Sequence, residues 1–380
     1  MEPRFHSGCR LATCQAQAEA SAGKRLRRVG ARLYNPARSW RPPPQGRDRV
    51  RVAGGGEGTG LERVFAYYDE GLHPDHTLVV DGLVSRGPSL SHWPGNRTPE
   101  RYRADTTTEM ALRLAEDPRR EEFLSGIRVV SNNHFDTDGL LSVWAVLHPG
   151  EALRHRRFLV DAARAGDFGT FTSADAVKFD LMVTTFGEPG RSPLRSRVRE
   201  GSEREWQQGI YDHLLSNLPD LFYTTQAHRE VWQEPFESIV HSFERVRDGA
   251  AKIREYPGSC LSVIETEEDL EPMARFDSCR FHRMLTAQRD GRGYRFELAH
   301  HIFSWFDTVT PPRGARIDLA PCASQLNAID PSREGRWTYT GNEDLAARLF
   351  RADDAGSSTV SGLPLRRVEE FLVASLRNGR

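Results

Sequence analysis

The chain has 380 residues, with 52 Lys+Arg against 53 Asp+Glu, and 38% of its residues are hydrophobic. This length suffices for two or three domains with a sizeable core, and no apolar run approaches the ~18 residues that a membrane span needs. The N-terminus has no apolar signal region and the five cysteines form no CxxC pair, so we expect a cytoplasmic protein without a zinc knuckle or a redox motif.

Residues 1–60 hold an excess of positive charge, with 12 Lys+Arg against 4 Asp+Glu. Only seven of these residues are Phe, Ile, Leu or Val, whereas 14 are Gly or Pro. Such a segment buries too little apolar surface to offset its ordering entropy, so we predict a disordered basic tail. An Arg-rich organelle-targeting segment is the alternative. The rest of the chain is acidic, which argues against binding of long nucleic acid.

Residues 61–187 alternate short apolar runs with helical patterns. This alternation predicts an α/β domain with a partly parallel sheet and flanking helices. The expected strands are residues 77–80 and 127–131. The expected helices cover residues 105–116, with Asp105 as its N-cap, and residues 139–147, 153–165 and 173–185.

The remaining sequence predicts three further parts. Residues 188–202 are rich in Pro, Gly, Ser and Arg and are read as a linker. Residues 203–256 are read as a helical segment interrupted at Pro219 and Pro235. Residues 257–380 are read as a C-terminal α+β region. Its expected strands are residues 261–266, 281–287 and 294–299, the last two forming a hairpin, and its expected helices are residues 319–328 and 364–377.

The segment HFDTDGLLS, residues 134–142, carries the strongest chemical signal. It lies between a predicted strand and a predicted helix, where open α/β sheets place ligands. His134, Asp136 and Asp138 alternate, so an extended backbone would place them on one face. One imidazole and two carboxylates suit Mn²⁺ or Mg²⁺ better than a thiolate-loving metal.

Two other interpretations compete for this segment. A calcium-binding EF-hand loop fails, because alignment on Gly139 places His134 and Ala145 where acidic ligands are required. A purely structural interpretation makes Asp138 a helix N-cap and Asp136 a turn former. It gives no reason for His134, and the metal and structural interpretations both stay open at this point.

The pattern HxDxDGxxS after a strand resembles the first motif of the DHH phosphoesterase superfamily. The resemblance covers His134, Asp136, Asp138, Gly139 and Ser142, and it implies that the histidine and both aspartates bind catalytic manganese ions. No Asp-His-His tripeptide and no GGGH signature follow in the sequence. The chain as a whole resembles an uncharacterised bacterial, actinobacterial-like family.

Further acidic and histidine residues could complete such a site. A dinuclear centre needs about two more carboxylates. Asp81 ends a predicted strand and Asp167 lies at a predicted helix end, so these two are the preferred additional metal ligands. His92, in the loop-like segment SHWPGN, is a further candidate.

The leading hypothesis is a metal-dependent, phosphoesterase-like hydrolase that acts on a small phosphorylated molecule. In it Asp136 and Asp138 are the catalytic residues, and Mn²⁺ or Mg²⁺ activates water and neutralises phosphoryl charge. The alternative is a non-catalytic α/β binding protein that retains a degraded phosphoesterase motif. A further Asp or His within ~5 Å of Asp136 and Asp138 separates the two hypotheses, because paired metals lie about 3.5–4 Å apart.

Overall fold

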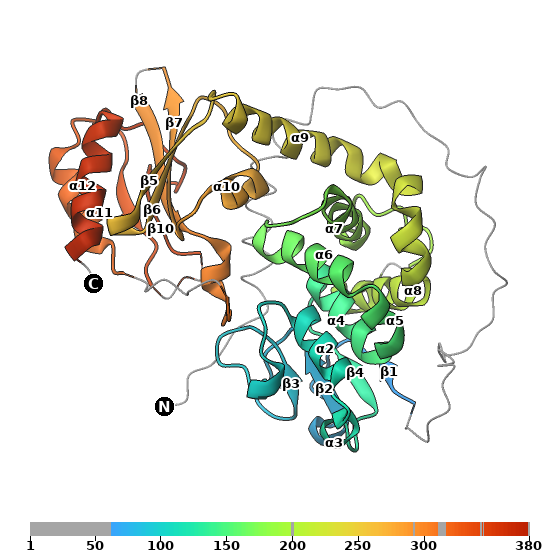
Figure 1. The fold of residues 1–380 in the computed structure, drawn as a ribbon. Coiled ribbons are helices and arrows are strands. Elements are labelled where there is room, and N and C mark those ends of the chain that lie inside the picture. Colours follow the sequence, from blue (N-terminus) through green and yellow to red (C-terminus); the bar gives the residue numbers. More distant parts are fainter. Residues whose placement is uncertain are drawn as a thin grey trace. The chain divides into compact units, whose positions relative to one another are not determined.

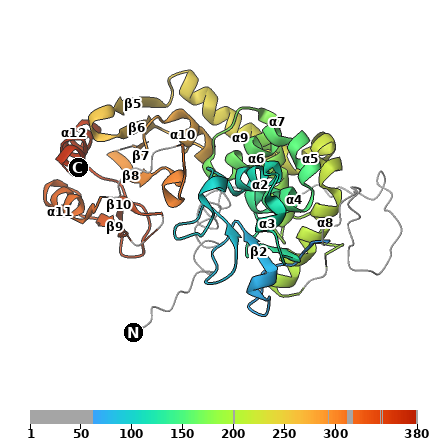
Figure 2. The ribbon, with the colours of Figure 1, turned by 60° about the horizontal axis from the view of Figure 1, so that its bottom comes forward.

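The computed structural model describes residues 62–198, 201–291, 293–310, 317–342, 344 and 346–378. The predicted disordered tail, residues 1–60, lies outside them. The described residues form a four-stranded parallel sheet, sheet A, a six-stranded mixed sheet, sheet B, and several helices (Figures 1 and 2). This mixed α/β architecture confirms the predicted fold class.

Sheet A contains short, mostly buried strands in the order β1-β4-β2-β3. All its pairs are parallel, with Thr77 opposite Val129 at the centre and Val80 opposite Leu90 at one side. Continuous apolar runs are typical of strands that are covered on both faces. The strands are β1 (Val64–Phe65), β2 (Thr77–Val80), β3 (Ser89–Leu90) and β4 (Val129–Ser131).

The helices that follow β3 and β4 pack on sheet A and on one another. Helix α4 contacts strands β2 and β4 as well as helices α2 and α6. Its buried Trp144 belongs to the same hydrophobic core as Leu78 and Val130 of the sheet. The helices are α2 (Thr107–Glu116), α3 (Arg120–Phe123), α4 (Thr137–Leu147), α5 (Pro149–Arg154), α6 (Arg156–Phe168) and α7 (Ala174–Gly187), with 3-10 turns η2 (Pro74–His76) and η3 (Glu100–Tyr102).

Two long helices come next, α8 (Glu203–Thr224) and α9 (Arg229–Arg247), joined by η4 (Thr225–His228). The predicted interruptions at Pro219 and Pro235 are wrong, because both prolines lie inside these helices. A proline removes one backbone hydrogen bond from a helix. Helix α8 continues past it because its apolar face, including Leu218 and Leu221, is buried in the core.

Sheet B has the strand order β5-β6-β7-β8-β10-β9, and its own hydrophobic core includes Leu285, Phe296 and Trp337. Only the pair β6-β7 is parallel, and β7-β8 form the predicted hairpin. The strands are β5 (Lys252–Tyr256), β6 (Leu261–Thr266), β7 (Arg283–Asp290), β8 (Gly293–His300), β9 (Arg336–Tyr339) and β10 (Arg348–Ala352). The accompanying helices are α10 (Pro272–Ser278), α11 (Ala320–Ile329) and α12 (Leu365–Asn378), with 3-10 turns η5 (Pro257–Ser259) and η6 (Ile302–Trp305).

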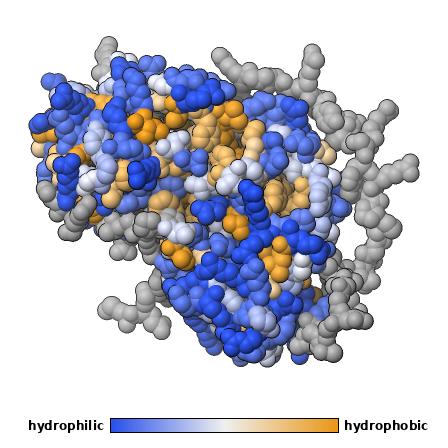
Figure 3. All heavy atoms as spheres, viewed as in Figure 1, coloured by the Kyte–Doolittle hydropathy of each residue, from blue (hydrophilic) through white to orange (hydrophobic). Residues whose placement is uncertain are grey.

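The face of the molecule seen in Figure 3 is largely hydrophilic, with smaller hydrophobic patches between the polar residues. Among the described helices, none combines the length and the apolarity that crossing a bilayer requires. The exposed large hydrophobic side chains of the described residues come from separate elements and loops: Val64, Leu83, Tyr223, Val240, Val309 and Ile329.

Candidate metal centre

The site lies where the two central strands of sheet A end. Strand β2 ends at Val80 and is followed by Asp81, and the neighbouring strand β4 ends at Ser131 and leads into the 134–142 motif. Because the strands are parallel, their carboxyl ends meet at one edge of the sheet. Asp81 has a φ of 51°, a left-handed conformation that non-glycine residues adopt rarely and that concentrates at functional sites.

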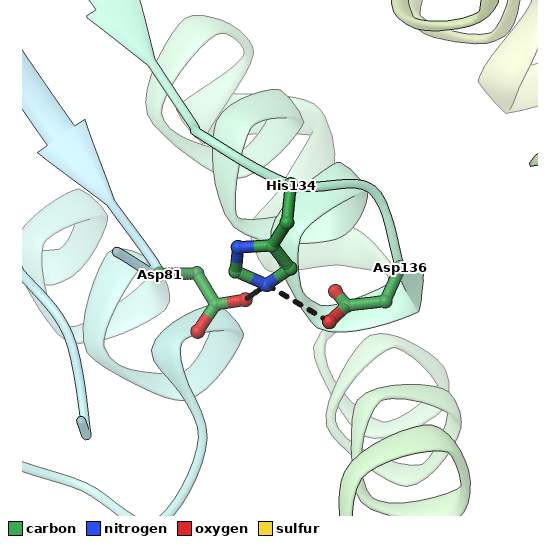
Figure 4. Close-up of side chains that lie close together, drawn as sticks. All are labelled: Asp81, His134 and Asp136. Carbon is green, nitrogen blue, oxygen red and sulfur yellow. Dashed lines mark ion pairs between the residues drawn. The ribbon is translucent and has the colours of Figure 1, made fainter. Parts of the chain in front are cut away.

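The side chains of Asp81, His134 and Asp136 form one group whose nitrogen and oxygen atoms could bind a metal ion (Figure 4). Nε2 of His134 lies 3.0 Å from Oδ2 of Asp81 and 3.0 Å from Oδ2 of Asp136. The His134 side chain is 32% exposed and that of Asp136 is 27% exposed. This group therefore borders the solvent through His134 and Asp136, whereas Asp81 is buried.

A buried group of ligand atoms consists of Asp81, His92 and Asp138. Nε2 of His92 lies 3.2 Å from Oδ1 of Asp81 and 3.9 Å from Oδ2 of Asp138. Asp167 joins this group from the end of α6, with its Oδ2 3.6 Å from the same His92 nitrogen. The side chains of this group are at most 8% exposed. We call the two groups the outer and the inner ligand set.

Asp81 belongs to both sets. One of its carboxylate oxygens faces His134 and the other faces His92. The ligand atoms of Asp81, His134 and Asp136 lie within 4.8 Å of one another, and so do those of Asp81, His92 and Asp138. A carboxylate placed in this way can bridge two cations, and paired metal ions in hydrolases lie about 3.5–4 Å apart.

Oδ2 of Asp167 is buried and accepts no hydrogen bond of normal geometry among the described residues, with Nε2 of His92 3.6 Å away. Nε2 of His134 is buried as well, but it lies between the carboxylates of Asp81 and Asp136. A buried polar oxygen without a hydrogen bond costs free energy, so the Asp167 oxygen is available to a further ligand. Carboxylate oxygens and imidazole nitrogens are common ligands of divalent metal ions in proteins. The residues present therefore fit a divalent cation.

The pKa shifts of the site residues indicate that negative charge is in excess among these side chains. Burial raises the pKa of Asp138 to about 6, with repulsion from Asp81 as the next cause. Burial, followed by repulsion from Asp138, also holds the pKa of Asp167 well above its usual range. Burial acts against the charged form of His134, yet the neighbouring Asp136 and Asp81 outweigh it and raise its pKa. In the absence of a cation, protons on these side chains reduce the negative charge of the site. A bound cation would reduce it in the same way.

The pKa of Asp81 moves in the opposite direction. Burial favours its neutral form, but His134 and then His92 outweigh burial and hold the pKa of this carboxyl below its usual range. Asp81 is therefore ionised where it lies between the two imidazoles, in the form that binds cations.

The two motif aspartates also cap helices, in an arrangement that differs from the predicted structural roles. Asp136, and not Asp138, is the N-cap of α4, with its Oδ1 accepting the backbone N–H of Gly139 at 2.7 Å. Asp138 instead accepts the backbone N–H groups of Thr107 and Thr108 at the start of α2, both at 2.7 Å. Each oxygen retains a second lone pair, so capping and metal binding are compatible.

The prediction that Asp105 caps α2 is wrong. The N-cap is Thr106, whose hydroxyl accepts the backbone N–H of Glu109. The pattern Thr106-x-x-Glu109 matches the capping-box spacing, so the sequence held the correct signal. The carboxylate of Asp105 binds the backbone N–H groups of Val309 and Thr310, which lie about 200 residues further along the chain.

The structure brings all six predicted site residues into one cluster: Asp81, His92, His134, Asp136, Asp138 and Asp167. The structure also places aromatic side chains around His92, and the sequence did not predict these contacts. The ring of Phe306 lies 4.1 Å from that of His92 and 4.8 Å from that of Trp93, and Phe168 lies 5.7 Å from Phe306. Nothing in the sequence near Phe306 signals this contact, because the residue comes from the segment after sheet-B strand β8.

Residues 62–380 match a family model described as "Family of unknown function (DUF6687)", so the chain belongs to that family. No curated protein matches the chain. Among solved structures, a pGpG-specific phosphodiesterase, PggH from Vibrio cholrae, covers 80% of this chain and 100% of its own, with 11% identity and a TM-score of 0.30. We infer neither a shared fold nor a shared activity from a similarity at that level.

Proposed function

We propose that this chain is a metal-dependent, phosphoesterase-like hydrolase that acts on a small phosphorylated molecule in the cytoplasm. The observation that carries the proposal is the position of Asp81, whose two oxygens face His134 at 3.0 Å and His92 at 3.2 Å. A single buried carboxylate shared by two ligand sets could hold two cations close together, as a dinuclear hydrolytic centre needs.

The outer set, His134, Asp136 and Asp81, would hold one cation, and the inner set, His92, Asp138, Asp167 and Asp81, would hold the other. Divalent ions supply two things to phosphoryl chemistry, a bound water of lowered pKa and neutralisation of the developing charge. Mn²⁺ and Mg²⁺ both suit these donors. The resemblance of the motif to that of DHH phosphoesterases agrees with this assignment.

Each carboxylate has a distinct task in this proposal. Asp136 is partly exposed, so it is the motif aspartate that substrate can approach. Asp138 is fully buried and joins α4 to α2, so it shapes the inner set. Substrate would approach from the side of His134 and Asp136. The carboxylates there repel a long polyanion such as nucleic acid, and they favour a small phosphorylated ligand whose charge is partly neutralised by bound cations.

The test combines metal stoichiometry with hydrolysis. We expect wild-type protein to bind two Mn²⁺ per chain by calorimetry and to hydrolyse a model phosphodiester such as bis(p-nitrophenyl) phosphate. Asp136→Asn should lose the outer ion and at least about 100-fold in rate while keeping its fold, because asparagine caps helices as well as aspartate. Asp175→Asn is the matched control, since Asp175 is an exposed α7 residue paired with Lys178.

Three results would overturn the proposal: no stoichiometric metal binding by wild type, unchanged metal binding in Asp136→Asn, or metal binding without hydrolysis of any phosphoester offered. The last result would favour the alternative, a non-catalytic binding protein with a degraded motif.

A further inference from the structure

We propose that residues 306–310, referred to below as the strap, close the inner ligand set and set the rate at which its cation is released. The proposal rests on the two-cation site described above. It makes Phe306 and Asp105 positioning residues, which act on the site through His92 and do not themselves touch a cation.

The strap is held by hydrogen bonds to residues around the inner set. Oδ1 of Asp105 accepts the backbone N–H groups of Val309 and Thr310, both at 2.8 Å. The Thr310 hydroxyl donates to the other oxygen of Asp105. The backbone N–H of Asp307 donates to the carbonyl oxygen of His92 at 2.6 Å. Four hydrogen bonds thus join this short segment to two residues near the site.

Phe306 places an aromatic ring directly against a metal-ligand candidate. Its ring centroid lies 4.1 Å from that of His92, and the rings are inclined by 30°. The residue is only 4% exposed, and it also contacts Trp93 and Phe168. Because apolar side chains exclude water, this contact keeps solvent away from the imidazole.

Asp105 couples the strap to the orientation of His92. Its backbone carbonyl lies 2.7 Å from Nδ1 of His92, while its carboxylate binds the strap. A hydrogen bond to one ring nitrogen fixes the tautomer and leaves the other nitrogen as the ligand. Nε2 of His92 is therefore the atom that faces Asp81 and Asp138.

The outer set has less cover, because the side chains of His134 and Asp136 are 32% and 27% exposed, whereas those of His92 and Asp138 are 1% exposed or less. An ion in the outer set should therefore exchange with solvent more easily. An ion in the inner set can leave only when the surrounding groups move. The two ions should therefore be released at different rates, and the strap should determine the slower one.

The experiment is release of Mn²⁺ from the loaded full-length protein into excess EDTA, followed by stopped flow. Wild type should show a fast and a slow phase of equal amplitude. Phe306→Ala should accelerate the slow phase by about 10- to 100-fold, the size of effect that residues supporting a ligand have on metal binding. The fast phase should not change. Phe306→Leu, which restores part of the cover, should give an intermediate rate.

Two further variants distinguish an effect of the strap from a general loss of structure. Thr310→Val removes one hydroxyl at an exposed position of the strap and should accelerate only the slow phase, by a smaller factor. Val309→Ala is the matched control, because the side chain is 57% exposed and its backbone N–H is retained, so neither phase should change.

The strap proposal is overturned if wild type binds two ions but releases them in one phase, or if Phe306→Ala leaves the slow phase unchanged. It is also overturned if Phe306→Ala and Thr310→Val accelerate both phases equally, since that indicates loosening of the whole site. Failure of wild type to bind Mn²⁺ at all rejects the proposed function instead, so the two failures can be distinguished.

Discussion

Asp138 accepts the backbone N–H of Thr107 through Oδ2 at a distance of 2.7 Å, so a carboxylate in the first turn of α4 binds the N-terminus of α2. Its other oxygen accepts the N–H of Thr108, also at 2.7 Å. Helix N-termini leave N–H groups without intrahelical partners, and a negative charge there is favourable. One residue therefore joins two helices of the core and the inner ligand set.

Substitution Asp138→Asn should lower both stability and metal binding. The amide can accept only one of the two N–H groups, and its NH₂ group would face the other donor. We expect a loss of about 1–3 kcal/mol in the free energy of unfolding, since a buried donor is left without a partner. Urea unfolding of the metal-free protein measures this. Asp136→Asn should lose much less, and equal losses in the two variants would contradict the capping role of Asp138.

Gly139→Ala should destabilise the protein, although alanine is normally preferred to glycine in a helix. A Cβ at this position would lie 2.3 Å from Nδ2 of Asn132 and 2.9 Å from the Tyr211 hydroxyl. Overpacking of this kind costs about 1–3 kcal/mol. The thermal midpoint should fall, and Mn²⁺ affinity should fall with it because Asp136 and Asp138 flank the glycine.

Gly150→Ala is the control for this substitution. Gly150 lies in α5, and no atom lies within 4 Å of a Cβ placed there. Its thermal midpoint should stay the same or rise slightly. A Gly139→Ala protein as stable as Gly150→Ala would show that the close packing around Gly139 is not a constraint.

Metal affinity should rise with pH. Burial and then Asp81 raise the pKa of Asp138 to about 6, so this carboxyl is protonated below that pH and a cation must displace the proton. His134, whose pKa is also raised, must lose its proton too. Mn²⁺ titrations at pH 5, 6 and 7.5 should show increasing affinity, with proton release detected in buffers of different ionisation enthalpy. An affinity that is flat over this range would contradict the prediction.

Asp180 should make the metal-free protein less stable at alkaline pH. Burial raises the pKa of this carboxyl from 3.8 to about 7, although the Thr137 hydroxyl donates to it at 2.6 Å. A folded-state pKa above the unfolded value contributes stability that is complete below about pH 4 and is lost as the pH rises to about 7. With each pKa unit worth about 1.4 kcal/mol, the loss amounts to a few kcal/mol.

Asp180→Asn should remove this dependence, because the amide oxygen still accepts the Thr137 hydroxyl and carries no charge. At pH 8 the variant should be more stable than wild type, and at pH 4 the two should be similar. Unfolding by urea at both pH values measures the difference. A variant that is less stable than wild type at pH 8 would show that the Asp180 carboxylate is stabilised by contacts other than the Thr137 hydroxyl.

Elements whose signals are local can be predicted from the amino-acid sequence. Strands 77–80 and 261–266 were predicted with the bounds that the structure has, because continuous apolar runs flanked by polar residues define them. Helices α4 and α7 follow from apolar periodicity and start signals in the same way. The segment from His134 to Asp138 is predicted as the candidate site because an imidazole and two carboxylates directly follow a strand.

Which distant groups share the candidate site depends on long-range packing, which the sequence does not reveal. Parallel pairing of β2 with β4 places Asp81 beside His134, and the path of the chain after sheet-B strand β8 places Phe306 on His92. The structure also gives the two aspartates other roles than the structural interpretation predicted, because Asp136 caps α4 and Asp138 accepts N–H groups at the start of α2. Local propensity contains no information on such contacts, since they depend on strand order and on packing between segments far apart in the chain.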